Sequence, residues 1–163
     1  MISGNEFRRA LGNFPTGVTV ITAATDSGPV GMACNSMTAV SLDPPLVLVC
    51  TAHTSETWPL IRATGRFVVN VMANDQAEMT RRFATKGTDR FAAVGLHPRS
   101  HGIGLDGALA WIECTIHDEH RAGDHSIVVG RVHELDAPGQ REPLLFFRGA
   151  FGSFLPKSIE PQP

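Results

Sequence analysis

Two clusters of small polar residues are the part of this sequence best suited to binding a ligand. The first, GMACNSMTAVSLDPP, occupies residues 31–45, and the second, TAHTSETW, occupies residues 51–58. Small side chains let backbone N–H groups approach a ligand, and a Ser/Thr-rich turn can bind an anion without Lys or Arg. The two turns could hold a flat heterocycle and its phosphate. They could equally be polar loops that cap neighbouring elements.

A second glycine-rich segment matches a nucleotide-binding motif in its spacing but not in its context. Residues 102–107, GIGLDG, fit G-x-G-x-x-G. A dinucleotide fingerprint needs a strand before it and a helix after it. Here a polar segment containing Pro98 precedes the glycines, and an alternating strand follows them. We therefore expect a turn at this place and no Rossmann fold. The sequence also carries no G-x-S-x-G nucleophile motif and no P-loop.

Histidines are the next candidates for chemistry, as metal ligands. His97 and His101 are four residues apart, and His117 and His120 are three apart. A helical pair at such spacing could share a metal ion. The first pair, however, lies among Pro and Gly, and the second lies at the end of an expected strand. The sequence therefore predicts surface or turn histidines and no metal site.

The composition narrows the class of protein. The chain has 163 residues, 42% hydrophobic and 18% charged, with a formal charge of −2. This suits one folded domain and offers no basic surface for nucleic acid. No apolar run approaches the length of a membrane span, and residues 1–9 lack a signal-peptide core. Cys34, Cys50 and Cys114 form no C-x-x-C pair, so we expect buried free thiols and a cytoplasmic protein.

The hydrophobic periodicity predicts mostly strands with three short helices. Ser3 and Glu6 have capping-box spacing and open a helix over 5–13. A second helix covers 58–63, and a second capping box at Asp75 and Glu78 opens a third towards residue 83. The expected strands cover 18–22, 29–33, 46–50, 67–72, 112–117, 126–132 and 144–147. Because strands and long helices do not alternate, we expect an antiparallel barrel over residues 1–155, with a frayed tail at 156–163.

Six blocks of sequence, in register over nearly the whole chain, resemble the flavin reductase-like family. They are FPTGVTVIT (14–22), the segment 31–45, the segment 83–91, GALAWIEC (107–114), GDHSIVVGRV (123–132) and PLLFFRGAFG (143–152). The resemblance is strongest to reductase components of two-component flavin-dependent monooxygenases. It implies an FMN-binding split β-barrel, antiparallel and Greek-key-like, with a few short flanking helices.

The resemblance also implies a set of site residues. The turn that surrounds the flavin would comprise Met32, Ala33, Cys34, Asn35, Ser36, Thr38 and Ser41. The phosphate end would comprise Ala52, His53, Ser55 and Thr57, with Arg82, Phe83 and Lys86 nearby. NAD(P)H would lie at His125, Arg148 and Phe151. Relatives often have Tyr at the position of Phe151, so a hydroxyl contact is missing there.

The activity implied is hydride transfer from NADH or NADPH to FMN or FAD, by a homodimer that supplies reduced flavin to a separate monooxygenase. The cofactor carries this chemistry, so no protein nucleophile is needed. His125 is the expected catalytic residue, as a nicotinamide contact; a histidine satisfied by a backbone group in a turn is the alternative. Two other functions stay open. One is a flavin- or haem-binding carrier without turnover, and the other is direct reduction of a small organic substrate by bound flavin.

Overall fold

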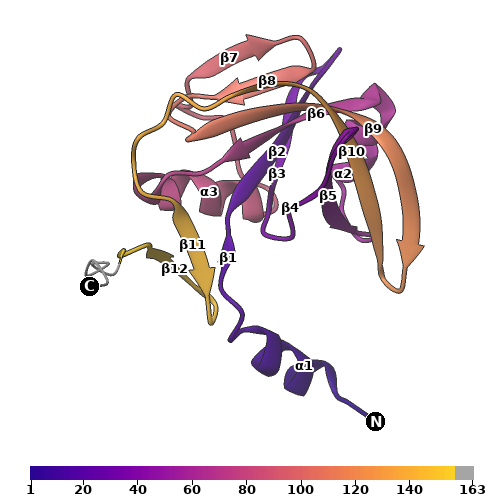
Figure 1. Ribbon diagram of the computed structural model, residues 1–163, viewed down its shortest axis with the longest axis vertical. Coiled ribbons are helices and arrows are strands. Elements are labelled where there is room, and N and C mark those ends of the chain that lie inside the picture. The colour runs from indigo at the N-terminus through magenta and orange to yellow at the C-terminus, as the bar shows by residue number, and fades with distance from the viewer. Residues whose placement is uncertain (157–163) are drawn as a thin grey trace, which may run out of the picture.

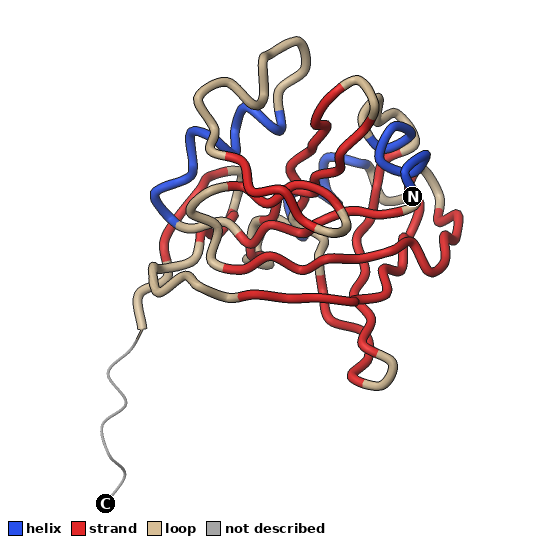
Figure 2. Tube along the Cα trace, turned by 90° about the horizontal axis from the view of Figure 1, so that it is seen from above, coloured by secondary structure: helices blue, strands red, loops and turns tan. Residues whose placement is uncertain are grey.

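A computed structural model describes residues 1–156, so all but one residue of the predicted frayed tail lies outside the described part of the chain. Figures 1 and 2 show that strands dominate and that helices are few and short. The helices are α1 (Gly4–Leu11), α2 (Trp58–Thr64), the 3-10 turn η1 (Asn74–Gln76) and α3 (Ala77–Ala84). The strands are β1 (Thr16–Gly17), β2 (Thr19–Thr25), β3 (Gly28–Cys34), β4 (Thr38–Leu42), β5 (Pro45–Ala52), β6 (Arg66–Val71), β7 (Leu96–Arg99), β8 (Gly102–Leu105), β9 (Ala110–Ala122), β10 (His125–Asp136), β11 (Leu144–Phe147) and β12 (Ala150–Ser153).

The main sheet has seven strands in the order β3-β2-β6-β9-β10-β5-β4, and every pairing in it is antiparallel. No ladder of hydrogen bonds joins its two edges within residues 1–156. The sheet nevertheless curls until the end of β3 reaches β5, where Ser36 Oγ accepts a hydrogen bond from the backbone N–H of Cys50 at 2.8 Å. The predicted split, antiparallel β-barrel is confirmed.

Three apolar clusters form the core of residues 1–156, and the smallest comprises Val68, Ala108 and Trp111. The two larger ones lie next to the parts of the chain that hold β3. One lies inside the barrel, where Ile21, Val49 and Phe67 meet Trp58 and Ile61 of α2. Helix α2 therefore packs its Trp58 and Ile61 side chains into the barrel interior. The other cluster lies between the sheet, α3 and β11, and includes Met72, Phe83, Leu105 and Leu144. Burying a side chain of this size stabilises the fold by about 1.5–3 kcal/mol, so these two clusters hold β3 and the turn that follows it in place.

The sequence signals for the start of a helix are correct for α1 and α2 and wrong for α3. Ser3 caps α1, and the reciprocal bond from Glu6 completes the predicted capping box. Helix α2 begins at the predicted residue. The expected capping box of Asp75 and Glu78 is wrong, because a 3-10 turn intervenes before α3. Instead, the side chain of Gln76 accepts a hydrogen bond from the N–H of Ala73 at 2.9 Å.

The G-x-G-x-x-G segment is a strand rather than a turn. Residues Gly102–Leu105 form β8, which pairs with β7 and leads through a turn at Gly107 towards β9. A side chain at Gly102 would meet Val68 Cγ2 at 3.2 Å, and one at Gly104 would meet the Trp111 indole at 2.9 Å. The glycines therefore let this hairpin pack closely on the sheet, and the absence of a following helix agrees with the rejection of a Rossmann fold.

A buried carboxylate fastens the β7–β8 hairpin to β9. Glu113, whose side chain is 2% exposed, accepts a hydrogen bond from the backbone N–H of His101 at 3.0 Å. The imidazole Nδ1 of His101 lies 3.3 Å from the same carboxylate, and Arg99 Nη1 lies at 3.7 Å. His101 also stacks in parallel on His133, with ring centroids 4.9 Å apart. The histidine that sequence spacing offered as a metal ligand thus serves the packing of a hairpin.

Two of the other candidate metal ligands, His97 and His120, lie beside carboxylates. His97 Nε2 lies 3.3 Å from Asp106, and His120 Nε2 lies 3.1 Å from Asp118. Within residues 1–156, no three His, Cys, Asp or Glu side chains gather in a way that could hold a metal ion. Among the helices of that same segment, none combines the length and the apolar character needed to cross a lipid bilayer.

All three cysteines are free thiols. Cys34 and Cys114 are buried, but Cys50 is only partly buried, which corrects the expectation that all three would be fully inside. Burial, with the neighbouring Glu113 charge as a smaller cause, raises the pKa of the Cys114 thiol to about 12.

Candidate functional site

Two adjoining cavities meet at the turn between β3 and β4. The first has a volume of about 310 Å³ and is lined by Val18, Ala33, Cys34, Asn35, Thr80, Ala84, Phe146 and Phe151. The second, of about 920 Å³, is lined by residues that include Thr16, Asn35, Ser36, Met37, Thr38, Phe146 and Arg148. Asn35 and Phe146 line both. The turn predicted to surround the flavin therefore faces open space on two sides.

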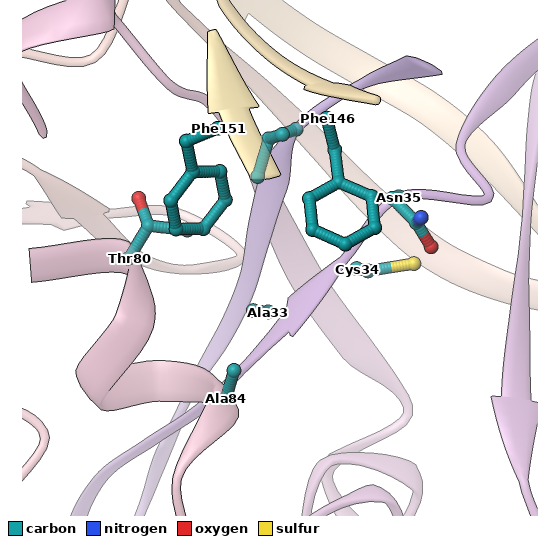
Figure 3. A pocket seen from close by; sticks show the side chains of 8 residues that line it. Ala33, Cys34, Asn35, Thr80, Ala84, Phe146 and Phe151 are labelled. Carbon is teal, nitrogen blue, oxygen red and sulfur yellow. The ribbon is translucent and has the colours of Figure 1, made fainter. Parts of the chain in front are cut away.

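Figure 3 shows how three parts of the chain build the first cavity. The end of β3 supplies Asn35 with its small neighbours, and α3 supplies Thr80. Phe146 of β11 and Phe151 of β12 close the cavity with an edge-to-face pair, their ring centroids 5.8 Å apart. The Arg81 guanidinium lies over the ring of Phe151, 5.4 Å from its centroid. The arrangement gives flat apolar walls with an amide at one side.

Ser36 lines the second cavity and also fixes the turn through its hydroxyl. Its Oγ accepts from the N–H of Cys50 at 2.8 Å, lies 3.3 Å from the carbonyl oxygen of that residue, and lies 3.0 Å from the Sγ of Cys34. These contacts hold β3 and β5 together at the seam of the barrel. Asn35, next to it, is left to line both cavities.

The second polar cluster lies where β5 ends and α2 begins. The N–H of His53 donates to the carbonyl oxygen of Asp124 at 3.0 Å, and its Nε2 lies 3.3 Å from Ser126 Oγ. Ser55 Oγ accepts a hydrogen bond from the N–H of Trp58 at 3.0 Å and lies 3.8 Å from Met32 Sδ. The two predicted halves of the site, on β3 and after β5, are thus neighbours in space.

Arg90 is a site residue that sequence reasoning missed. Its Nη1 donates to Thr57 Oγ1 at 2.7 Å and to the carbonyl oxygen of Gly31 at 2.8 Å. The guanidinium therefore joins the expected phosphate end to β3. The signal was present, since Arg90 lies in one of the six resembling blocks, but two other basic residues nearby were favoured instead.

Those two residues have other partners. Arg82 Nη1 donates to the carbonyl oxygen of Ala92 at 2.6 Å. Lys86 pairs with Glu56 at 2.7 Å on the surface, and this hydrogen bond and the lysine charge lower the pKa of the Glu56 carboxyl. Neither bonds to Thr57, so of these three basic residues Arg90 is the one that contacts Thr57.

Two further predicted contacts fall away from the cavities. Phe83 is 1% exposed and packs against Phe91 in the core, where an added Cβ at Gly31 would meet its ring at 2.9 Å. Its ring packs under β3 and lines neither cavity, so contact of Phe83 with a cofactor stays a prediction. Ser41 lies beside an irregularity of the β4–β5 pairing and lines neither cavity.

His125 opens β10, directly after the turn from β9, and lies opposite Ala52 of β5. Its Nδ1 lies 2.7 Å from the Asp124 carboxylate, and this hydrogen bond, with the imidazole charge, lowers the pKa of Asp124. His125 lines neither cavity that holds Asn35, whereas Phe151 and Arg148 each line one. The three residues expected at the nicotinamide thus come from two separate hairpins, β9–β10 and β11–β12, and His125 lies on the side of Ala52.

The side chains that line the two cavities are of the types that a flavin requires. Two aromatic rings and small residues suit a planar ring system, and the Asn35 amide suits its polar edge. Each cavity also has a buried hydroxyl in its wall, Thr80 Oγ1 in the first and Thr16 Oγ1 in the second, with no hydrogen-bond partner among the described residues. Buried polar groups are nearly always paired in native proteins, so these two hydroxyls are consistent with a polar ligand at the turn.

Comparison with known proteins agrees with this geometry. Residues 11–155 match the family described as "Flavin reductase like domain". The chain is 43% identical to the reductase subunit HsaB of a flavin-dependent monooxygenase from Mycobacterium tuberculosis, with 98% of this chain and 87% of that protein covered.

Solved structures lead to the same family. A nitrilotriacetate monooxygenase component B homologue from Mycobacterium thermoresistibile superimposes with a TM-score of 0.91 at 44% identity, covering 98% of this chain and 90% of that one. The NADH:FAD oxidoreductase SgcE6 of Streptomyces globisporus, in complex with NAD and FAD fragments, gives 0.89 at 36% identity, covering 97% and 98%. With its barrel, its turn at the β3–β5 seam and this match over nearly its whole length, the chain belongs to the flavin reductase-like family.

Proposed function

We propose that this protein transfers a hydride from NADH or NADPH to FMN or FAD and supplies the reduced flavin to a partner monooxygenase. The observation that carries the proposal is the juxtaposition at the barrel seam. The β3–β4 turn, the end of β5 and Arg90 meet there, in a chain of the flavin reductase-like family. Relatives named as reductase subunits of monooxygenases support the partner.

The residues of the site divide into three tasks. The turn at Asn35, held by Ser36, presents the flat part of the site. Thr57, held by Arg90, marks the phosphate end. A flavin bound there supplies a hydride acceptor, N5, for the C4 hydride of a nicotinamide. The protein's part is to hold the two rings in contact and to exclude water, because a misplacement of about 1 Å can slow such a step on the order of a hundredfold.

Purified protein tests this proposal directly. NADH or NADPH oxidation, followed by the loss of nicotinamide absorbance, should begin when FMN or FAD is added. A protein that binds flavin tightly, but whose flavin neither nicotinamide bleaches, would be a carrier and would end the proposal. Oxidation that requires a small organic substrate but no added flavin would identify a reductase of that substrate instead.

We also propose that the protein works as a homodimer. Helix α1 has no buried residue, and it lies beyond β1, away from the main sheet (Figure 1). Phe7 and Leu11 are each 56% exposed, and Phe14 is 73% exposed. An apolar surface of this kind usually marks an interface, and Leu11 and Phe14 line the second cavity. Light scattering should give twice the chain mass of 17.5 kDa; a monomer with flavin bound would contradict the dimer.

A further inference from the structure

A third cavity continues from the expected phosphate end of the flavin site. It has a volume of about 460 Å³ and shares Ala52, His53 and Ser55 with that end. From there it extends along α2 and the β9–β10 hairpin, where Arg62, Arg121 and Ser126 line it. The flavin phosphate, if held where we propose, would lie at the mouth of this cavity.

The charges in this cavity favour an anion. Glu119 is the one carboxylate among the described residues that line it, and it is already engaged. Arg62 Nε lies 2.9 Å from one of its oxygens, and Trp58 Nε1 donates to the other at 3.4 Å. Arg121 and His53 also line the cavity, and no other carboxylate among the described lining residues remains to pair with them. Together with the Ser126 hydroxyl, they form a set of donors suited to phosphate oxygens.

The cavity's position decides which phosphate-bearing group fits. FMN ends at its single phosphate, so a bound FMN would leave this cavity vacant. FAD continues from the same phosphate into a second phosphate and an adenosine. We propose that the cavity between α2 and the β9–β10 hairpin binds the adenosine diphosphate part of FAD, with Arg121 contacting the diphosphate, so that this reductase prefers FAD to FMN. The proposal rests on the placement of the flavin phosphate in the proposed function.

The test measures flavin binding by fluorescence quenching, without NADH, so that it does not depend on turnover. The wild-type protein should bind FAD at least tenfold more tightly than FMN. Arg121→Gln should raise the FAD dissociation constant about tenfold relative to that of FMN, which corresponds to about 1.4 kcal/mol. Arg121→Lys, which keeps the charge, should recover part of the loss. Arg131→Gln, an exposed arginine on β10 that does not line this cavity, is the matched control and should keep the wild-type ratio.

Two further measurements separate the possible occupants. ADP should compete with FAD in the wild-type protein but should not displace FMN. With FMN as acceptor, the KM for NADH should be the same in Arg121→Gln as in the wild type. If Arg121→Gln raised that KM and left the FAD-to-FMN ratio unchanged, the cavity would hold the adenosine diphosphate of the nicotinamide cofactor, and the FAD assignment would be overturned.

Equal affinity of the wild-type protein for FMN and FAD would also overturn the proposal. A protein that binds FAD as expected but fails to oxidise NADH or NADPH would refute the proposed function and leave this inference standing. The two failures are therefore distinguishable.

Discussion

Replacing Arg90 with Lys tests whether this residue organises the phosphate end of the site. Arg90 donates to Thr57 Oγ1 at 2.7 Å, to the carbonyl oxygen of Gly31 at 2.8 Å and to that of Thr85 at 3.3 Å. A lysine keeps the charge but has no planar fork, so it can reach one of these acceptors and not all three. Each hydrogen bond contributes about 0.5–1.5 kcal/mol net. Losing two should cost about 1–3 kcal/mol.

Two assays report this loss. In thermal unfolding, 1 kcal/mol corresponds to about 2–4 °C for a chain of this size, so Tm should fall by about 2–12 °C. In flavin titrations, the dissociation constant should rise about tenfold, because Thr57 loses the group that orients its hydroxyl. Lys86→Ala is the control, since the Lys86–Glu56 pair is exposed and such pairs contribute about 0–1 kcal/mol.

A double-mutant cycle makes the reasoning refutable. Thr57→Val and Arg90→Lys should each weaken flavin binding, and the double variant should lose less than the sum of the two. We expect a coupling of about 1 kcal/mol, within the range seen for residues in contact. Additive losses would show that the 2.7 Å contact does not contribute to flavin affinity, and wild-type flavin affinity in Arg90→Lys would refute the assigned role.

Three other perturbations have definite expectations. His125→Ala should raise the KM for NAD(P)H or lower kcat and leave the flavin dissociation constant nearly unchanged; steady-state and binding data that show the reverse would assign His125 to flavin. Glu113→Ala should destabilise the fold by about 3–5 kcal/mol in urea unfolding, because it removes the buried anion beside Arg99 and His101. Burial raises the pKa of the Cys114 thiol to about 12, so the folded state keeps the thiol protonated at a pH where the unfolded chain loses the proton. The free energy of unfolding should therefore fall between about pH 9 and 12, by at most about 1.4 kcal/mol per pH unit. Cys114→Ala should show a flatter pH dependence of stability in this range.

The architecture was predictable because its signals are local. The β-branched and apolar runs that became β2, β5 and β6 need no knowledge of their neighbours, and Ser3 with Glu6 marks the start of α1 without tertiary contacts. The capping box at Asp75 failed because Gln76, one residue along, bonds to Ala73 and starts a 3-10 turn instead. Two overlapping local signals compete at such a place, and packing decides between them.

The site was predictable by region and less so by side chain. The turn at Asn35 and the cluster at Ser55 were both selected from the sequence, and the structure brings them together. Which basic residue reaches Thr57 depends on how the loop after α3 folds back over Gly31. Arg82, Lys86 and Arg90 all have the right charge and lie close together in sequence. Only the three-dimensional path of that loop separates them. The β7–β8 hairpin was missed for a related reason, since its strands are short and its attachment to β9 depends on the buried Glu113.

The open seam of the barrel couples ligand occupancy to the opening motions of the fold. At the seam, β3 and β5 are joined by the Ser36 side chain and not by a ladder, so local opening there breaks no backbone hydrogen-bond ladder. A flavin that touches both strands acts as a non-covalent cross-link, and at a hundred times its dissociation constant it adds about 2.7 kcal/mol to stability. Amide protons of β3 and β5 should therefore exchange with solvent more slowly when flavin is bound. Under the proposed function, release of reduced flavin to a monooxygenase would return the barrel to its more readily opened state.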